Sequence, residues 1–487
     1  MLKKTTAAAL AAGSALLLSS PAWLPRRVVS VRMKLFARVN GDEGLPFPQE
    51  AYGGAERFEE IYGRPAANGR SKGAALSDLF WYWLAPGADI HQEHLEAGPR
   101  YDEVSRRTLA ILAGPSAELY DAAARSTRRV LDTLPADSVR PVRLRDLMMP
   151  VWAEFFYTLV FREDCPPAAR KLIVDNAEDV VNALKCTRLR HMRRRDRLTR
   201  YLLRRLAAGD VPHELPAGLT RRQHAYYLQG TFFNTAVVQM SEAMAHLLLV
   251  LAQHPGVQER VAAGNDDDRY LSHVMNETFR LFPLFGVAHR ITTADIDLEG
   301  MPLIPSGSVL TFNYPEYHAT GYTDPERFDP ERWETLSAKE AHHIPFGIAA
   351  NRPCPAWRLS PIAMRAATRE VLARFELDSP VSHTRSIPHR APCLLIPRDR
   401  PADTPRRRVL RAALTVRDRA EDVGRSLTQL VLGTYMVLDA RRTKPAARFF
   451  AEHDTEGRPL PREHAAPGAG GQREPAVTTC PYTGRST

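Results

Sequence analysis

The sequence predicts a mainly α-helical protein with a small β-rich lobe. Apolar residues recur with helical periodicity over most of the chain, at 76–84, 101–112, 117–134, 151–161, 172–206, 224–254, 270–282 and 359–375. Short apolar runs separated by Gly and Pro turns occupy 296–312, and a further short run lies at 393–396. The segments with helical periodicity therefore contain many more residues than the short strand-like runs.

Several element boundaries can be justified from single residue types. Residues 41–73 are rich in Gly, Pro and Glu and are predicted to be loop-like. Pro283 ends the helix over 270–282, because proline cannot continue a helix. Pro361 suits the first turn of the helix over 359–375, where its missing N–H is not needed.

The longest periodic segment, 224–254, is expected to be a core helix. Residues 226–238 are apolar on most sides, which is typical of a helix inside a large protein. A membrane span is the competing interpretation. Polar side chains within the segment weigh against it, because polar groups in lipid are costly; they are Gln229, Asn234, Gln239 and Glu242.

Composition limits the classes of function. The chain has 487 residues, of which 44% are hydrophobic, so it can bury a large core. Its net charge of +10 comes partly from arginine clusters at 191–197 and 406–411. These clusters are either solvated helix faces or a basic surface for an acidic partner. No recognition motif supports binding to nucleic acid.

The cysteines indicate a reducing, cytoplasmic location. The chain has five, Cys165, Cys186, Cys354, Cys393 and Cys480, and none forms a Cys-x-x-Cys pair. The spacing argues against a structural zinc site, and an odd, scattered count argues against a disulfide framework.

The two ends of the chain differ in composition from the centre. Residues 1–32 contain two lysines, an Ala/Leu run and a small-residue stretch, so they form a signal-like or anchor-like segment. This segment is a cleaved signal, a weak membrane anchor, or an extension before a start at Met33. We assign 33–400 to a central domain. Residues 401–487 form a C-terminal extension that is partly helical, with an apolar stretch at 427–438, and is then predicted to be disordered from Asp454.

Cys354 is the first candidate for chemistry. It lies between two prolines just before the helix over 359–375. A thiolate there would be stabilised by the positive end of the helix and by Arg352. Taken alone, however, a single cysteine is more often buried and inert.

Other motifs precede Cys354 in a characteristic order. They are Glu277-x-x-Arg280 on a helix, a strand-and-turn region, Pro325-Glu326-Arg327-Phe328, Phe346-Gly347, and Arg352 two residues before Cys354. This combination resembles the cytochrome P450 family. The resemblance implies a cytochrome P450-like fold over 33–400. It also implies haem b as the cofactor, with Cys354 as the ligand of its iron.

The resemblance implies roles for several arginines. Arg290 and Arg352 would pair with the haem propionates, because a guanidinium suits a carboxylate. Arg106 or Arg107 would supply a third partner. Phe346 would contribute to the haem-binding loop.

The Glu-x-x-Arg pair and the segment after it are expected to be structural. In the family this pair joins the segment that follows the small sheet and supports the face of the haem. Glu277, Arg280 and Arg327 would therefore stabilise the fold rather than act in catalysis.

The sequence departs from the family pattern in two places. Phe346 lies eight residues before Cys354 instead of seven, and Ala350 and Ala356 stand where glycines are usual. In the long helix, Thr235 matches the family's threonine, but Asn234 replaces the acid and Phe232 the glycine. Asparagine can orient water but cannot act as an acid. We expect Thr235 and Asn234 to be catalytic.

These features favour a haem-thiolate monooxygenase that inserts one oxygen atom from O2 into a small organic substrate. The chain carries no flavin or iron–sulfur motif, so electrons would come from a separate ferredoxin and ferredoxin reductase or an equivalent pair. Two alternatives stay open. One is a peroxide-using, isomerase-type or dehydratase-type haem enzyme, and the other is a haem- or substrate-binding protein without turnover. Membrane contact through the N-terminal segment stays open as well. His91 and His94 are expected to be an unliganded pair rather than a second metal site.

Overall fold

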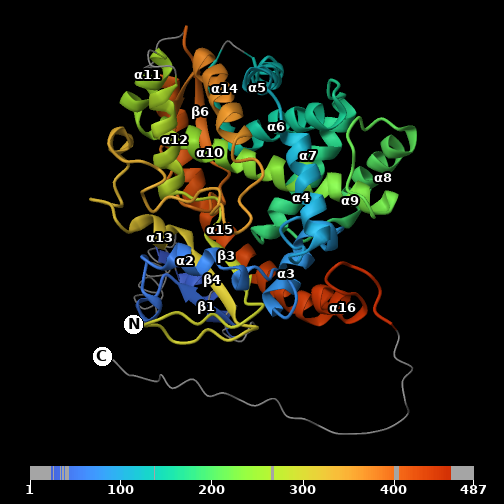
Figure 1. Cartoon of the computed structure of the whole chain (residues 1–487). Coiled ribbons are helices and arrows are strands. Elements are labelled where there is room, and N and C mark those ends of the chain that lie inside the picture. Colours follow the sequence, from blue (N-terminus) through green and yellow to red (C-terminus); the bar gives the residue numbers. More distant parts are fainter. Residues whose placement is uncertain are drawn as a thin grey trace, which may run out of the picture.

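The computed structural model shows a helical body with two small sheets (Figure 1). It describes residues 43–461 except 136–137, 265–267 and 400–404, together with 23–25, 27–32, 34–35 and 38. The mainly α prediction with a small β part is confirmed. The apolar run before residue 23 and the chain after residue 461 lie outside the described residues.

Most predicted helices are present within a few residues of their expected ends. They are α3 (Ala75–Leu84), α4 (Pro99–Leu112), α5 (Ser116–Leu131), α6 (Leu144–Phe161), α12 (Arg269–Leu281) and α14 (Leu359–Arg374). Shorter helices are α2 (Phe58–Gly63), α11 (Pro255–Ala263), α13 (Tyr314–Ala319) and the 3₁₀ turns η1 (Glu50–Tyr52), η2 (Pro65–Ala67), η3 (Ala88–Ile90) and η5 (Pro330–Glu334). The loop-like prediction for 41–73 is therefore only partly right.

The helix predicted over 172–206 is two helices, α7 (Pro167–Leu184) and α8 (Met192–Ala208). The backbone leaves helical geometry at Cys186, whose φ is 53°. The amide of Thr187 then donates to the carbonyl of Asn182 at 2.9 Å and closes the turn. Periodicity continues across this break, which is why the sequence did not reveal it.

A continuous helical segment crosses the centre of the molecule. It consists of α9 (Arg221–Gly230), a π-helical turn η4 (Thr231–Ala236) and α10 (Val237–Gln253). Among the described residues it is the one segment long and apolar enough to span a bilayer, but 83% of its most apolar window is buried inside the protein. It packs with α6, which is buried on nearly all sides, so it is a core helix, as predicted.

The strands form two three-stranded sheets. One has the order β1 (Gly44–Phe47), β4 (Val309–Asn313), β3 (Val287–Ile291), with β1 parallel and β3 antiparallel to β4. The other is antiparallel, with the order β2 (Arg140–Arg143), β6 (Pro392–Pro397), β5 (Phe375–Asp378).

Two strand predictions need correction. The run at 296–298 forms a single bridge, Ile296 to Ile304, and not a strand. The neighbouring strand β3 was missed because its sequence, Val-Ala-His-Arg-Ile, lacks clear alternation of apolar and polar residues.

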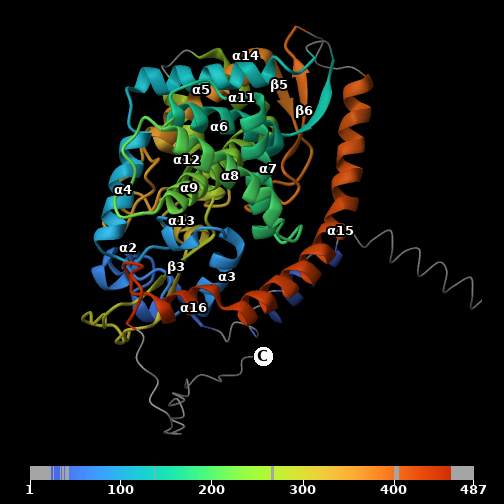
Figure 2. The same cartoon turned by 90° about the vertical axis from the view of Figure 1, so that its right-hand side faces the viewer.

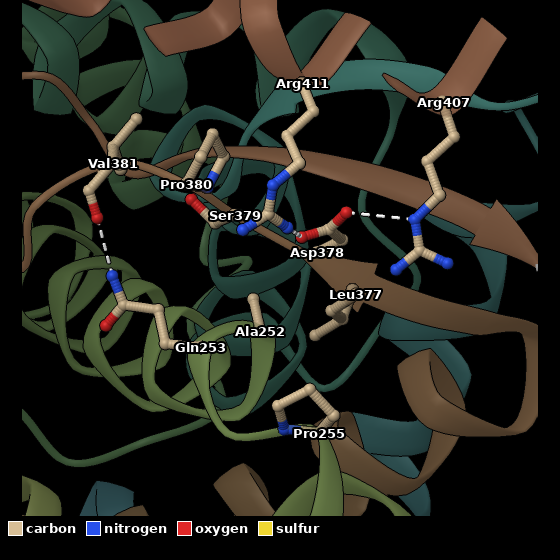
Figure 3. A pocket seen from close by; sticks show the side chains of 10 residues that line it. All are labelled: Ala252, Gln253, Pro255, Leu377, Asp378, Ser379, Pro380, Val381, Arg407 and Arg411. Carbon is tan, nitrogen blue, oxygen red and sulfur yellow. Dashed lines mark hydrogen bonds and ion pairs between the residues drawn. The ribbon is translucent and has the colours of Figure 1, made fainter. Parts of the chain in front are cut away.

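The C-terminal extension contains a long helix on the outside of the body. Helix α15 (Pro405–Thr443) runs along one side and is followed by α16 (Pro445–Glu452) beside α3 (Figure 2). The beginning of α15 is fixed by Asp378 at the end of β5. This carboxylate accepts from Arg407 Nε at 3.0 Å and pairs with Arg411 (Figure 3).

The chain after α16 differs from the disorder predicted from Asp454 onward. Residues 454–461 form a turn closed by a bridge between His453 and Pro459. The carboxylate of Glu456 accepts from the amide of Arg100 at 2.9 Å, at the beginning of α4. The turn is thus held by contacts with a distant helix, which local composition does not reveal.

Glu277 accepts five hydrogen bonds, two from Arg280 on its own helix α12 and three that connect α12 to η5 and the residue before it. The carboxylate is fully buried and accepts from Arg280 Nε and Nη2, at 2.9 and 2.8 Å. It also accepts from the amide of Asp329 at 3.0 Å, from Arg332 Nε at 3.1 Å and from Trp333 Nε1 at 3.0 Å. The structural role expected for the pair is consistent with this geometry.

The expected role of Arg327 is wrong in detail. Its backbone carbonyl accepts from Arg280 Nη2 at 3.2 Å, but the guanidinium that reaches Glu277 is that of Arg332. The short helix η5 turns Arg332 and Trp333 toward α12, and Arg327 lies before this turn.

Replacing Glu277 by Ala is expected to lower the free energy of unfolding by about 3–5 kcal/mol, because the buried Arg280 loses its counter-charge. The matched control is Glu60→Ala, since Glu60 pairs with Arg64 at 2.7 Å on the surface. That change should cost less than about 1 kcal/mol. Urea unfolding followed by circular dichroism measures both, and equal losses would contradict the structural role of Glu277.

Candidate functional site

A cavity of about 290 Å³ lies between η4, α10, β3 and the loop that carries Cys354. Its walls are mostly apolar, with Phe80, Phe156 and Phe285 among them. All six site residues expected from the sequence line it: Asn234, Thr235, Arg290, Phe346, Arg352 and Cys354. The structure therefore brings together side chains from three separate parts of the chain.

Cys354 is held in a turn before α14. Its amide donates to the carbonyl of Phe346 at 2.8 Å, which closes the loop between them. Burial raises the pKa of the Cys354 thiol to about 11, and the backbone N–H of Ala356 only partly offsets this. In the protein without a metal, Cys354 is therefore a neutral thiol.

The expected stabilisation of a thiolate by Arg352 is not seen. The guanidinium of Arg352 lies over the ring of Tyr101, at 3.7 Å from its centroid, and donates to the carbonyl of Leu95. Desolvation therefore dominates at Cys354. A coordinating thiol, in contrast, is deprotonated by the metal that it binds.

The side chain of Asn351, in the same loop, points into the protein. This side chain is buried, and its Nδ2 donates to the carbonyls of Tyr62 at 2.6 Å and Ala67 at 3.0 Å. Gly347 and Arg352 adopt left-handed backbone conformations, with φ of 73° and 53°. The loop is thus fastened to the region of α2 and η2.

Three arginines converge on the cavity wall: Arg70, Arg290 and Arg352. Arg290 donates to the hydroxyl of Tyr62, and Arg70 lies 3.5 Å from the carboxylate of Glu93. The side chain of Glu93 is 45% exposed, and this surface faces the cavity. Arg70 was not singled out from the sequence, because nothing in its local pattern distinguishes it.

The other arginines proposed from the sequence, Arg106 and Arg107, lie elsewhere. Both pair with Glu103 on α4, and Arg107 also pairs with Glu214. Neither lines the cavity, so the expectation that one of them supplies the third partner is wrong. Arg70, in contrast, lines the cavity together with Arg290 and Arg352.

The arginine cluster fits a ligand with carboxylate groups. In these three side chains, five buried nitrogens have no hydrogen-bond partner among the described residues: Arg70 Nε and Nη2, Arg290 Nε, and Arg352 Nε and Nη2. Burial, together with the charges of Arg290 and Arg352, lowers the pKa of Arg70 to about 9. Glu93 balances only part of this charge. Unsatisfied buried donors are costly, so the cluster suits the two propionates of a haem.

The π-helical turn η4 supplies Asn234 and Thr235. Because a π turn contains extra residues, some of its backbone carbonyls accept hydrogen bonds from side chains instead of from the helix. Here the carbonyl of Phe233 accepts from Asn176 Nδ2 at 3.2 Å. Phe232 is fully buried, and the Oδ1 of Asn234 is buried without a partner among the described residues. The turn therefore exposes polar atoms to the cavity inside an apolar helix.

His91 reaches across to Thr235. Its Nε2 lies 2.7 Å from Thr235 Oγ1, while its Nδ1 accepts from the amide of Glu93 at 3.2 Å. Burial lowers the pKa of His91, although Glu93 and the backbone of Gly230 oppose the shift. The ring is therefore neutral at pH 7, with its proton on Nε2, and it donates to Thr235.

This contact depends on a close approach to the helix. A Cβ on Gly230 would lie 3.2 Å from His91 Cδ2, so glycine gives the ring room to reach η4. The sequence placed His91 near His94 but not near Thr235, because the contact joins residues 144 positions apart.

Curated relatives cover part of the chain. The "Putative cytochrome P450 135B1" of Mycobacterium tuberculosis is 30% identical over 171 residues, 32% of this chain and 36% of the relative. The "Cyclooctat-9-en-7-ol 5-monooxygenase" of Streptomyces melanosporofaciens is 30% identical over 141 residues, 25% of this chain and 30% of the relative. These alignments span about a third of the relatives' length.

Solved structures and a family model cover more of it. The retinoic acid-bound cyanobacterial CYP120A1 has a TM-score of 0.57 at 16% identity, covering 71% of this chain and 88% of that one. A zebrafish cytochrome P450 with abiraterone has a TM-score of 0.58 at 18% identity, covering 71% and 92%. Both show the same fold. A model of the "Cytochrome P450" family matches residues 143–401, more than half of the chain, so this protein belongs to the cytochrome P450 family.

Proposed function

We propose that this protein is a haem-thiolate monooxygenase that inserts one oxygen atom from O2 into a small organic substrate. Membership of the family implies a haem, and we propose that it is haem b. The observation that carries the proposal is the shared cavity, which collects the thiol of Cys354, three arginines with unpaired donors and the hydroxyl of Thr235.

In this proposal the chain binds the cofactor at two places. Cys354 would provide the sulfur ligand of the iron, and Arg70, Arg290 and Arg352 would pair with the propionates. A thiolate-ligated haem favours cleavage of the O–O bond once it is bound. The apolar walls, which include Phe232 and Phe285, would exclude water and select an apolar substrate.

His91 and Thr235 would hold a proton donor at the cavity. Because His91 Nε2–H donates to Thr235 Oγ1, the hydroxyl hydrogen of Thr235 is free to point elsewhere. The hydroxyl can then donate toward the cavity, next to the amide of Asn234. His91 acts here as a positioning residue for Thr235.

Electrons would come from a separate protein, such as a ferredoxin with its reductase. The sequence has no flavin or iron–sulfur motif, and its net charge of +10 favours an acidic partner. A peroxide-using enzyme, or an isomerase or dehydratase, is the second candidate. It is favoured by Asn234, which cannot titrate where the family has an acid.

The deciding experiment compares sources of oxygen and electrons. Product formation that requires NADPH, ferredoxin and ferredoxin reductase, and that does not occur with peroxide, supports the monooxygenase. Turnover with peroxide alone selects the second candidate. Haem incorporation without turnover on a broad panel of apolar compounds, under either condition, would favour a binding protein.

Replacing Cys354 by Ala should abolish the red-shifted Soret band of the reduced, CO-bound protein, because the axial sulfur is lost. The control is Cys165→Ala, since this buried cysteine lies outside the cavity. Absorption spectra of the purified proteins measure the effect. An unchanged spectrum in the Cys354 variant would refute thiolate ligation at this position.

Replacing Thr235 by Ala is expected to lower the yield of product per O2 consumed by about tenfold, because the positioned proton donor is lost. His91→Leu should act in the same direction, since it removes the hydrogen bond at 2.7 Å that orients Thr235.

The matched control for both is Thr231→Ala. Thr231 lies in the same π turn and lines the cavity, but its Oγ1 has no partner among the described residues. This variant should change the yield by less than about twofold. A Thr231 variant that uncouples as strongly as the Thr235 variant would show that the effect is not specific to the His91–Thr235 pair.

A further inference from the structure

The outward face of α15 carries an unbroken stripe of apolar and small residues. Its members are all exposed: Val409, Ala413, Val416, Ala420, Gly424, Leu427, Val431, Tyr435 and Leu438. The largest exposed fractions are 68%, 70% and 66% at Val409, Val416 and Val431. These residues have no counterpart in the family match, which ends at residue 401.

The spacing of the stripe repeats every eleven residues. Val409 is followed at intervals of eleven residues by Ala420 and Val431. In the same way, Val416 is followed by Leu427 and Leu438. A repeat of about 3.67 residues per turn nearly matches the α-helix, so the stripe runs straight along it for about 44 Å. Figure 2 shows that α15 curves around the body, and the exposed stripe follows the helix on its outward side.

The opposite face of α15 is already occupied by the body of the protein. The side chain of Gln429 donates to the carbonyl of Lys185 at 2.8 Å, and Tyr82 donates to Asp439 at 2.9 Å. Met436 and Val437 are buried against α3 and α7. Together with the Asp378 contacts, these interactions fix which face of α15 points outward.

The charged residues beside the stripe are mainly arginines. Apart from Arg411, which pairs with Asp378 on the inward side, the exposed ones on α15 are Arg406, Arg408, Arg417, Arg419 and Arg442; Arg417 pairs with Glu421 and Arg442 with Asp439. The acidic residues of α15 are only half-exposed and are paired with arginine: Asp418, Glu421, Asp422 and Asp439. A helix with an apolar stripe flanked by arginines is the pattern of a helix that lies on an anionic membrane.

The N-terminal segment reaches the same helix. Arg32 donates to the side chain of Gln429 at 3.0 Å, which places residues 27–32 beside α15. In the sequence, this segment follows Lys3, Lys4 and the Ala/Leu run that ends at Leu18. In the sequence, the apolar run therefore ends shortly before the segment whose Arg32 contacts α15.

We propose that the outward face of α15 docks on an anionic lipid bilayer, with the stripe in the interface and the arginines at the headgroups. A second copy of the chain is a poorer occupant. Two such faces would bring arginines against arginines, and like charges across an interface are unfavourable.

The proposal predicts that the full-length protein sediments with vesicles that contain phosphatidylglycerol and much less with vesicles of phosphatidylcholine alone. The triple variant Leu427→Gln, Val431→Gln, Leu438→Gln should bind the anionic vesicles at least about tenfold more weakly, because apolar area leaves the interface. The double variant Arg406→Gln, Arg419→Gln should bind more weakly than the parent at low salt. At high salt this difference should become smaller, because screening already weakens charge attraction in the parent.

The matched control is a triple variant on other faces, Leu109→Gln, Leu303→Gln, Leu460→Gln, whose leucines are 46%, 50% and 42% exposed. It should bind vesicles within about twofold of the parent. Thermal unfolding midpoints show that each variant is folded. Undiminished vesicle binding by the α15 triple variant would overturn the proposal, because the N-terminal run alone would then anchor the chain. The proposal would also be overturned if the parent did not bind vesicles but formed a dimer in sedimentation equilibrium, and the α15 triple variant were monomeric. The stripe would then be an interface with a second copy of the chain.

Discussion

Buried charges must be paired, and this constraint organises the region around the cavity. Glu277 meets it internally, because its carboxylate accepts five hydrogen bonds from α12 and from the segment up to Trp333. The segment that follows is held to the same helix, since His343 Nε2 contacts the carbonyl of Asn276 at 3.1 Å. The amide of Ile344 then donates to His318 at 3.0 Å. The loop that carries Cys354 therefore starts from a fixed point, and its position depends on this pairing.

Around the cavity, in contrast, the buried charges are not fully paired. Arg70, Arg290 and Arg352 place more buried N–H donors around it than Glu93 can satisfy. Unpaired buried donors are costly, and a dianionic ligand would pair with them. The cluster therefore favours ligands that carry negative charge, in addition to those that fit the shape of the cavity. Cys354 is comparable, because the burial that raises the pKa of its thiol would also exclude water from a metal held there.

The sequence predicted the parts of the site that depend on local order along the chain. Cys354, Arg352 and the Glu277–Arg280 pair were accessible because each lies in a short motif at a fixed spacing. Arg70, His91 and the choice of Arg332 over Arg327 were not, since each depends on a contact between distant segments or on the direction of a short helix. The long helices were predicted from periodicity, whereas β3 and the break at Cys186 were missed because their patterns are locally ambiguous.

Helix α3 joins the cavity to the C-terminal extension. Phe80 and Leu84 on one side of α3 line the cavity, while Leu79 and Tyr82 on the other side pack against α15. Asp78, also on α3, accepts from the first amides of α16, at 2.9 Å from Ala446 and 3.1 Å from Ala447. Without the extension, these apolar side chains of α3 would face water and the carboxylate would lose its donors. The extension is therefore part of what holds one wall of the cavity in place, because α15 packs against α3 and α3 lines the cavity.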